Sequence, residues 1–191
     1  GLQLSTEESE KAAVQFVIIA PGNEHDSTES YQLEITSKGI VVSAPSGAGL
    51  FYGFQTLLQL ADADTDGTYT LPLVDIKDAP RFAYRGLHQD VSRHFRTKEF
   101  IKKQLDAMAR YKLNTLHWHL TDGAGWRLEI KRYPELTEQA AYRPYPNWKA
   151  WWKGGRKYCT KDAPGADGGY YTQDDAREIV EYARQRHITV I

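Results

Sequence analysis

Residues 84–91, Tyr-Arg-Gly-Leu-His-Gln-Asp-Val, are typical of a β-strand, and residues 114–120, Asn-Thr-Leu-His-Trp-His-Leu, predict a second one. Between them, Thr97 precedes a segment whose apolar residues recur at i, i+4, i+7 and i+8, and it is expected to cap a helix there. The predicted inner face of this helix is formed by Ile101, Leu105, Met108 and Ala109. A strand, a crossover helix and a second strand predict a parallel sheet.

The same alternation continues toward the end of the chain. Residues 132–169 are rich in Tyr, Trp, Gly and Pro and predict a long loop, with a short hairpin before it over residues 126–130. Thr172 and Asp175 have the spacing of a capping box, which predicts a further helix. Its apolar positions are Ala176, Ile179, Val180 and Ala183. Residues 188–191, Ile-Thr-Val-Ile, predict a third strand.

This order of elements favours an α/β fold in which residues 80–191 form the start of a (β/α)₈ barrel. Such a barrel takes about 250 residues, which is more than the whole chain of 191 residues contains. We therefore expect the chain to be an N-terminal fragment of a longer protein, cut near the third strand of a TIM barrel.

Residues 1–79 predict a separate, small α/β sandwich domain that ends at a boundary near Ala79 and Pro80. Residues 14–19, Val-Gln-Phe-Val-Ile-Ile, indicate a buried strand. Residues 31–35 alternate between polar and apolar, and a Ser-Lys-Gly turn connects them to the apolar residues 40–43. This pair predicts a β-hairpin.

A helix is expected next, over residues 47–60. Its predicted apolar stripe consists of Leu50, Phe51, Phe54, Leu57 and Leu58. Residues 69–74 indicate a short strand, and Pro72 places it at a sheet edge because proline cannot donate a ladder hydrogen bond.

The composition excludes several classes of protein. With 24 Lys and Arg against 25 Asp and Glu, the net charge of −1 gives no reason to expect a nucleic-acid partner. The longest apolar run, residues 14–20, is far shorter than the ~20 residues of a membrane span. The single cysteine, Cys159, excludes an intramolecular disulfide. Residues 1–10 have neither the basic flank nor the apolar core of a signal peptide.

Arg93 lies just after the first predicted strand of the second part, where α/β folds place their sites. Its forked donors suit a carboxylate or the paired hydroxyls of a sugar. The alternative is that Arg93 only pairs with Asp90 and stabilises the end of the strand.

His117 and His119 share one face of the second strand because residues two apart in a strand point the same way. With Asp122 just beyond the strand, they have the residue types of a metal site in a barrel hydrolase. They could equally be neutral histidines that orient other groups. Asp122 is expected to project into the mouth of the barrel.

The aromatic residues of the loop are a third cluster: Trp148, Trp151, Trp152, Tyr158, Tyr170 and Tyr171. Sugar rings stack on aromatic faces, so a saccharide cleft is one interpretation. The other is that the loop packs on itself, while Lys149, Lys153, Arg156 and Lys157 keep it soluble.

Three ordered motifs in the second part resemble glycoside hydrolase family 20. They are Arg-Gly-Leu-His-Gln-Asp-Val-Ser-Arg-His-Phe over residues 85–95, Met-Ala-Arg-Tyr-Lys-Leu-Asn over residues 108–114, and His-Trp-His-Leu-Thr-Asp-Gly-Ala-Gly-Trp-Arg over residues 117–127. Residues 45–57 are similar to the helix of the α/β domain that precedes the barrel in this family. The resemblance implies an exo-acting β-N-acetylhexosaminidase that takes no cofactor and removes terminal N-acetylglucosamine or N-acetylgalactosamine.

The resemblance also implies roles for individual residues. Arg93 corresponds to the arginine that binds ring hydroxyls of the terminal sugar, and His119 lies beside the same site. Asp122 corresponds to the aspartate of an Asp–His–Glu chain that tunes the acid/base Glu. The mechanism implied is retaining and substrate-assisted, with the 2-acetamido oxygen in place of an enzyme nucleophile. Gly123 stands where many members of the family have a second aspartate.

The catalytic Asp-Glu pair of the family lies beyond the third barrel strand, so we expect the 191-residue chain itself to be inactive. The expected partners are glycans or glycoconjugates that end in N-acetylhexosamine, with no nucleic acid and no membrane span. The expected location is extracytoplasmic, after removal of a signal. Two alternatives remain: a metal-dependent barrel hydrolase that uses His117 and His119, and a non-catalytic carbohydrate-binding module built on the aromatic loop.

Overall fold

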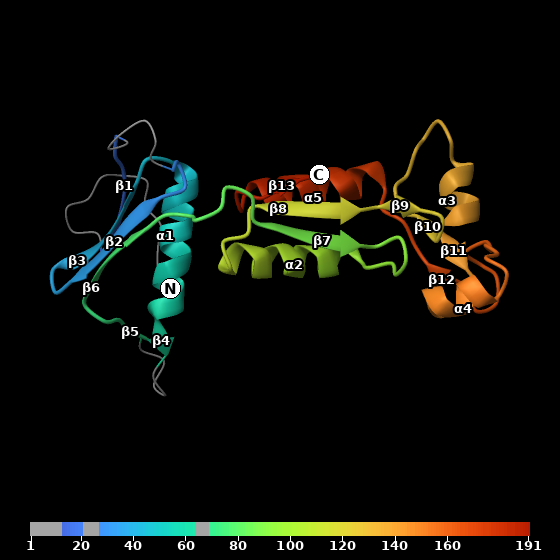
Figure 1. Cartoon of the computed structure of the whole chain (residues 1–191), viewed down its shortest axis with the longest axis horizontal. Helices are drawn as coiled ribbons and strands as arrows, with labels where there is room; N and C mark the ends of the chain where they lie inside the picture. Colours follow the sequence, from blue (N-terminus) through green and yellow to red (C-terminus); the bar gives the residue numbers. More distant parts are fainter. Residues whose placement is uncertain (1–12, 21–26, 64–68) are drawn as a thin grey trace. The chain divides into compact units, whose positions relative to one another are not determined.

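The computed structural model describes residues 13–20, 27–63 and 69–191, and it has two compact units divided between Ala83 and Tyr84. Both units combine strands with helices (Figure 1), so the α/β class expected from the sequence is confirmed. No helix among the described residues is long and apolar enough to cross a membrane.

The first unit is built on a four-stranded mixed sheet in the order β1-β3-β2-β6. β1 (Val14–Ile18) runs parallel to β3 (Gly39–Ala44), while β2 (Tyr31–Thr36) is antiparallel to both β3 and β6 (Val74–Asp78). The predicted hairpin is therefore confirmed, as β2 and β3. A small second sheet pairs β4 (Asp62–Ala63) with β5 (Tyr69–Thr70).

The helix α1 (Gly47–Leu60) packs on this sheet and begins where predicted. Ser46 caps it by accepting hydrogen bonds from the backbone N–H groups of Ala48 and Gly49. The predicted apolar stripe is partly wrong, because Tyr52 is buried whereas Leu58 is 51% exposed. The core combines one face of α1 with the alternate residues of two strands: Tyr31, Leu33, Ile35, Val42, Ala44, Tyr52 and Leu57.

Two predictions for strands of this unit need correction. The residues 69–74 do not form one edge strand, because β5 ends before Pro72 and β6 begins after it. β1 is a strand as predicted, but it is not buried, and Ile18 is 59% exposed. The reason is its position at an edge of the sheet, where β3 is its one neighbour among the described strands.

The second unit is built on a parallel three-stranded sheet in the order β13-β8-β7. The strands are β7 (Gly86–Asp90), β8 (Thr115–His119) and β13 (Thr189–Val190), all near their predicted positions. The crossovers are the helices α2 (Lys98–Arg110) and α5 (Gln173–Arg184).

The two crossover helices pack against each other, which places them on the same face of the sheet. Thr97 caps α2, and the capping box of Thr172 and Asp175 opens α5, both as predicted. All four residues of the predicted inner face of α2 are buried. In α5 the prediction fails at Val180, which is 49% exposed, because only Ile179 and Ala183 face the core.

Residues 132–169, which we call the aromatic lobe, contain regular structure rather than the predicted loop (Figure 1). The lobe contains the helices α3 (Glu135–Ala140) and α4 (Trp148–Lys153), and a two-stranded antiparallel sheet of β11 (Tyr142–Arg143) and β12 (Asp167–Gly168).

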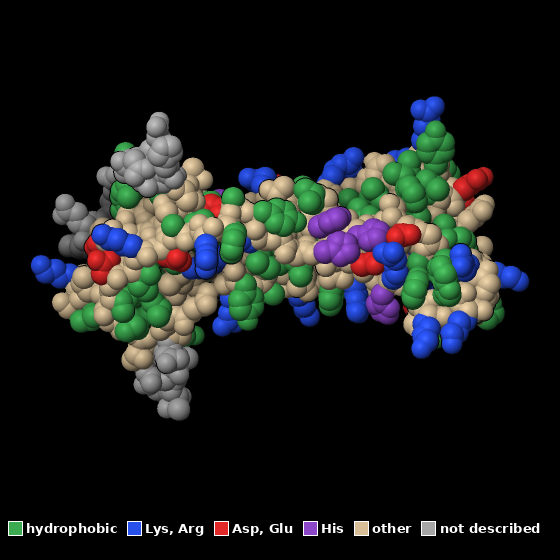
Figure 2. Space-filling model, viewed as in Figure 1, with side chains coloured by type: hydrophobic (Ala, Val, Ile, Leu, Met, Phe, Trp, Pro, Cys, Tyr) green, Lys and Arg blue, Asp and Glu red, His purple; other side chains and the backbone are tan. Residues whose placement is uncertain are grey.

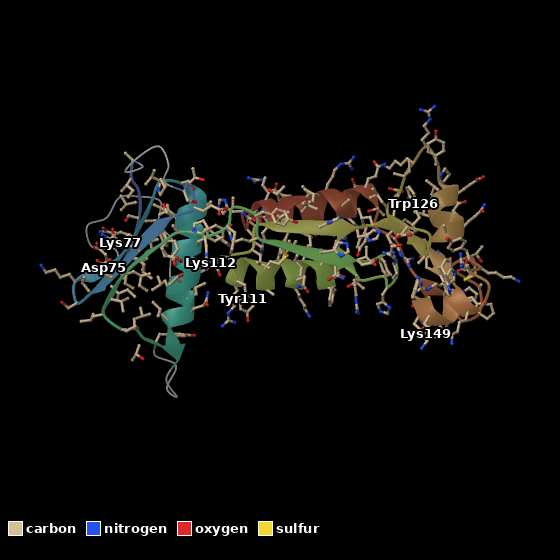
Figure 3. All side chains as sticks on the ribbon, in the orientation of Figure 1. Asp75, Lys77, Tyr111, Lys112, Trp126 and Lys149 are labelled. Carbon is tan, nitrogen blue, oxygen red and sulfur yellow. The ribbon has the colours of Figure 1, made fainter. Side chains whose placement is uncertain are left out.

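The hairpin expected over residues 126–130 lies earlier in the chain, as β9 (Thr121–Asp122) and β10 (Gly125–Trp126). Trp126, the last residue of this hairpin, is labelled in Figure 3. The Nε1 atom of Trp126 donates to the carbonyl of Leu128 at 2.6 Å. The lobe begins at residue 132, after this hairpin.

Candidate functional site

The candidate site lies at the carboxyl ends of β7 and β8. The last residues of these two parallel strands, Asp90 and His119, are register partners. Because parallel strands end at the same edge of a sheet, the residues just after them are brought together. Arg93 follows β7 and Asp122 follows β8, so the topology explains why these side chains lie close to each other.

Arg93 contacts two carboxylates at once. Its Nη1 lies 2.8 Å from Oδ2 of Asp90, and its Nη2 lies 2.8 Å from Oδ2 of Asp122. The pairing with Asp90 proposed from the sequence is therefore present, and it is combined with a contact to Asp122. The side chain of Arg93 remains 40% exposed, so it is still open to a ligand.

Asp90 is held in its charged form by the same arginine. Burial raises the pKa of the Asp90 carboxyl, but hydrogen bonds from the backbone and the side chain of Arg93 outweigh this effect. The net result is a pKa below the usual value. Asp90 is therefore an anion at neutral pH and fixes one branch of the Arg93 guanidinium.

His119 lies between the charged groups. Its Nδ1 is 3.2 Å from Nη1 of Arg93, and its Nε2 is 3.4 Å from Oδ2 of Asp122. His117 lies on the same face but contacts His88, whose ring centroid is 4.6 Å away. The histidines form a group next to acidic and basic side chains, which is visible in Figure 2.

His88 was missed in the sequence, although its signal was present. It is the register partner of His117 on the neighbouring strand, so aligning the two predicted strands could have found it. Within the described part of the chain, no group of three His, Cys, Asp or Glu residues could hold a metal ion. The described residues therefore give the metal-dependent alternative no ligand set.

A hollow of about 270 Å³ opens beside Arg93 and Asp122. It is bounded by residues of the two strand ends and of the aromatic lobe: Arg93, Asp122, Gly123, Ala124, Trp148, Trp151, Trp152, Arg156 and Tyr158. A Cβ at Gly123 would meet no atom within 4 Å, so the hollow is open next to this residue.

The aromatic residues divide between the interior of the unit and the hollow, so self-packing is present and the saccharide cleft stays a prediction. Trp151 and Tyr171 are buried and pack inside the unit, whereas Trp148 and Trp152 are 42% and 50% exposed beside the hollow. Lys149 points outward from the lobe, as expected for a solubilising residue (Figure 3). Arg156 does more than solubilise, because its guanidinium carbon lies 3.5 Å from the centroid of the Trp152 ring.

Two buried arginines bind the backbone next to the site, and no pattern in the sequence predicted their burial. Arg127 and Arg143 are each only 1% exposed. Burial, and then the nearby charge of Arg143, lowers the pKa of Arg127 to about 10. Burial also lowers the pKa of Arg143. Both guanidiniums donate to backbone carbonyls, which satisfies most of the donors that are shielded from water. Nε of Arg143 is buried without a hydrogen-bond partner among the described residues.

The sequence matches two parts of one enzyme family. Residues 82–191 match "Glycosyl hydrolase family 20, catalytic domain", and residues 1–79 match "Glycosyl hydrolase family 20, domain 2". A beta-hexosaminidase of Porphyromonas gingivalis is 43% identical over 169 residues, which are 85% of this chain and 20% of that protein. An N,N'-diacetylchitobiase of Vibrio harveyi is 42% identical over 85% of this chain and 18% of its own length.

Solved structures are similar over nearly the whole chain. The GH20 exo β-N-acetylglucosaminidase of Vibrio harveyi, in complex with N-acetylglucosamine, aligns with a TM-score of 0.78 and 34% identity, over 95% of this chain and 27% of that one. A β-N-acetylhexosaminidase of Bacteroides fragilis aligns with a TM-score of 0.77 and 32% identity, over 97% and 34% respectively. The chain spans about a fifth of the length of the curated relatives described above.

Proposed function

The chain belongs to glycosyl hydrolase family 20, and on that basis we propose that it is part of an exo-acting β-N-acetylhexosaminidase. The reaction is the removal of terminal β-linked N-acetylglucosamine or N-acetylgalactosamine from glycans or glycoconjugates. The names of the similar proteins, beta-hexosaminidase and chitobiase, support this activity. In the proposed fold, residues 1–79 are the domain before the catalytic one, and residues 80–191 are the first strands and helices of a (β/α)₈ barrel.

In this proposal Arg93 binds ring hydroxyls of the terminal sugar. Its guanidinium has five N–H donors, which is more than the contacts to Asp90, Asp122 and His119 require. The carboxylates fix its orientation before the sugar arrives, so less ordering is needed on binding. His119 is a second substrate-binding residue, because its ring lies next to the guanidinium of Arg93 that would bind the sugar.

Asp122 has the role of supporting the acid/base group of the enzyme. A carboxylate stabilises the protonated form of a neighbouring histidine, and that histidine in turn tunes the Glu that protonates the leaving oxygen. In this proposal both that histidine and the Glu belong to the part of the enzyme beyond the third barrel strand, so the histidine is not His119. The 2-acetamido group of the substrate acts as the nucleophile in this family. The single observation that supports this site is the 2.8 Å contact of Arg93 with Asp122 at the rim of an open hollow.

The test uses the whole protein and two aryl β-glycosides that differ only in the 2-acetamido group. We expect release of the aryl group from the N-acetylglucosaminide and none from the glucoside, because substrate assistance needs the acetamide oxygen. Treatment with a chelator should leave the rate unchanged, which separates this proposal from a metal-dependent hydrolase. Cleavage of both glycosides at similar rates would contradict the proposed mechanism. The 191-residue chain alone is expected to give only the background rate.

A further inference from the structure

Two buried guanidiniums bind the backbone carbonyls of three consecutive residues, Val91, Ser92 and Arg93. Arg127 donates through Nε to the carbonyl of Val91 at 3.0 Å and through Nη2 to that of Ser92 at 2.9 Å. Arg143 donates through Nη2 to the carbonyl of Arg93 itself, at 2.5 Å. Segment 91–93 lies beyond the end of β7, so these donors replace the partners that a sheet would have supplied.

Arg143 also reaches the second half of the site. Its Nη1 lies 3.5 Å from the carbonyl oxygen of Ala124, two residues after Asp122. One side chain thus contacts both the segment that carries Arg93 and the segment that carries Asp122. The planar guanidinium directs its donors toward both segments, and the contact with the Arg93 segment is the shorter of the two.

Arg143 belongs to the aromatic lobe, not to the strands that it supports. It lies on β11, which pairs with β12, where Asp167 approaches the guanidinium to 4.0 Å. Arg127 binds the lobe as well, through the carbonyls of Ala141 and Gly169. The lobe and the Arg93 segment are therefore connected through two charged side chains rather than through apolar packing alone.

Burial of two like charges in one place is unfavourable unless their donors are used. An apolar side chain could fill the space of Arg143 without this desolvation. What the arginine adds is a set of hydrogen bonds to the backbone of the site. From these contacts we infer that Arg143 is a positioning residue: it sets the place of Arg93 relative to Asp122, and through it the aromatic lobe controls how tightly the terminal sugar binds. This inference rests on the proposed role of Arg93.

The experiment measures KM and kcat of the whole protein with an aryl β-N-acetylglucosaminide. Arg143→Lys retains the charge and most of the side-chain stem but loses the fork, and Arg143→Met also loses the charge. We expect KM to rise and kcat/KM to fall by up to about 100-fold in both variants, because a misplacement of about 1 Å caused from outside the reacting centre can have an effect of this size. We expect kcat to fall as well, as we also expect when Arg93 itself is replaced by lysine. Added guanidinium ion should restore part of the affinity of an Arg143→Ala variant.

The matched control is Thr137→Ala in the same lobe. Thr137 is buried, and its hydroxyl donates to the carbonyl of Pro134 at 3.1 Å. Removal of this hydroxyl therefore weakens the lobe at a place that does not bind the Arg93 segment. KM should stay at the wild-type value in this variant even where Tm falls as far as in Arg143→Lys.

Equal KM values in the Thr137 and Arg143 variants at equal loss of Tm would show that Arg143 is only structural, and would overturn the inference. Should Arg143→Met and Arg143→Ala fail to fold, Arg143→Lys decides the question. An Arg93→Lys variant with unchanged KM would instead overturn the proposed role of Arg93, and with it this inference.

Discussion

Arg93 and Asp122 form an ion pair, with Nη2 and Oδ2 2.8 Å apart, across the ends of two adjacent parallel strands. Neither residue lies in a regular strand of the main sheet, so the pair depends on how the chain leaves β7 and β8. Both side chains are more than a third exposed. An exposed pair of this kind contributes little to stability, and its position beside a hollow favours a role in binding.

Arg93→Lys in the whole protein should weaken substrate binding and turnover together. Lysine retains the charge but cannot contact two carboxylates and a sugar with a fixed fork. We expect kcat/KM for an aryl β-N-acetylglucosaminide to fall by the equivalent of about 2–4 kcal/mol. A loss below tenfold would mean that Arg93 only stabilises the end of β7 through Asp90.

Asp122→Asn should act on kcat and its pH profile rather than on KM. The amide preserves the shape of the side chain but removes the charge that stabilises a neighbouring imidazolium. The measurement is kcat against pH for the wild type and the variant. If both kcat and the pH optimum stay the same, Asp122 is a structural residue at the strand end.

Trp152→Ala should raise KM about fivefold, the equivalent of about 1 kcal/mol of lost aromatic contact. Trp152 lines the hollow, is half exposed, and has Arg156 stacked on its ring. Tyr133→Ala is the matched control, since Tyr133 is 57% exposed in the same lobe but does not line the hollow. Equal changes of KM in the two variants would indicate that the aromatic residues pack on each other and do not bind the substrate.

The contact between α2 and α5 should weaken in acid. Nζ of Lys98 lies 2.6 Å from Asp175 and 2.8 Å from Glu178. The hydrogen bond from Lys98 is the largest cause of a lowered Asp175 pKa, and those from Lys102 and Lys98 lower the pKa of Glu178. Lowered carboxyl pKa values stabilise the fold above about pH 4 and cease to do so as the pH falls through the folded-state values.

The corresponding measurement compares Tm of the wild type and Lys98→Met at pH 7 and at pH 2–3. The variant should be less stable at pH 7, and the difference should shrink in acid. Arg177→Met is the control, because Arg177 pairs with Asp174 on an exposed surface of α5 alone. A difference in Tm that does not depend on pH would contradict this account of the helix contact.

Gly49→Ala should destabilise the first unit, although alanine is the better helix former by up to about 1 kcal/mol. A Cβ at Gly49 would lie 2.7 Å from Cβ of Ala44 and would also clash with the carbonyl oxygen of Ser30. The expected loss is about 1–3 kcal/mol in the free energy of unfolding, measured with urea. Gly47→Ala, at the exposed first residue of α1, should cost nothing.

The local pattern of the sequence predicted those features that depend on neighbours along the chain. Thr97 and Thr172 cap their helices as predicted, and Ile101 and Leu105 face the core, because caps and helical faces are set by residues within a few positions. The grouping of Arg93, His119 and Asp122 could also be predicted from the sequence, because neighbouring parallel strands end at the same edge of a sheet.

Features that depend on distant segments needed the tertiary structure. The exposure of β1 follows from its place at the edge of the sheet, and β5 and β6 are separate strands because they belong to different sheets, which no local pattern contains. Arg127 and Arg143 have the same side chain as the exposed arginines of this chain. They are buried where the aromatic lobe meets segment 91–93, and backbone carbonyls of both accept their hydrogen bonds. Sequence alone determined which residues stand at the strand ends, whereas the fold of the lobe decided what holds them there, because buried charges take their partners from distant parts of the chain.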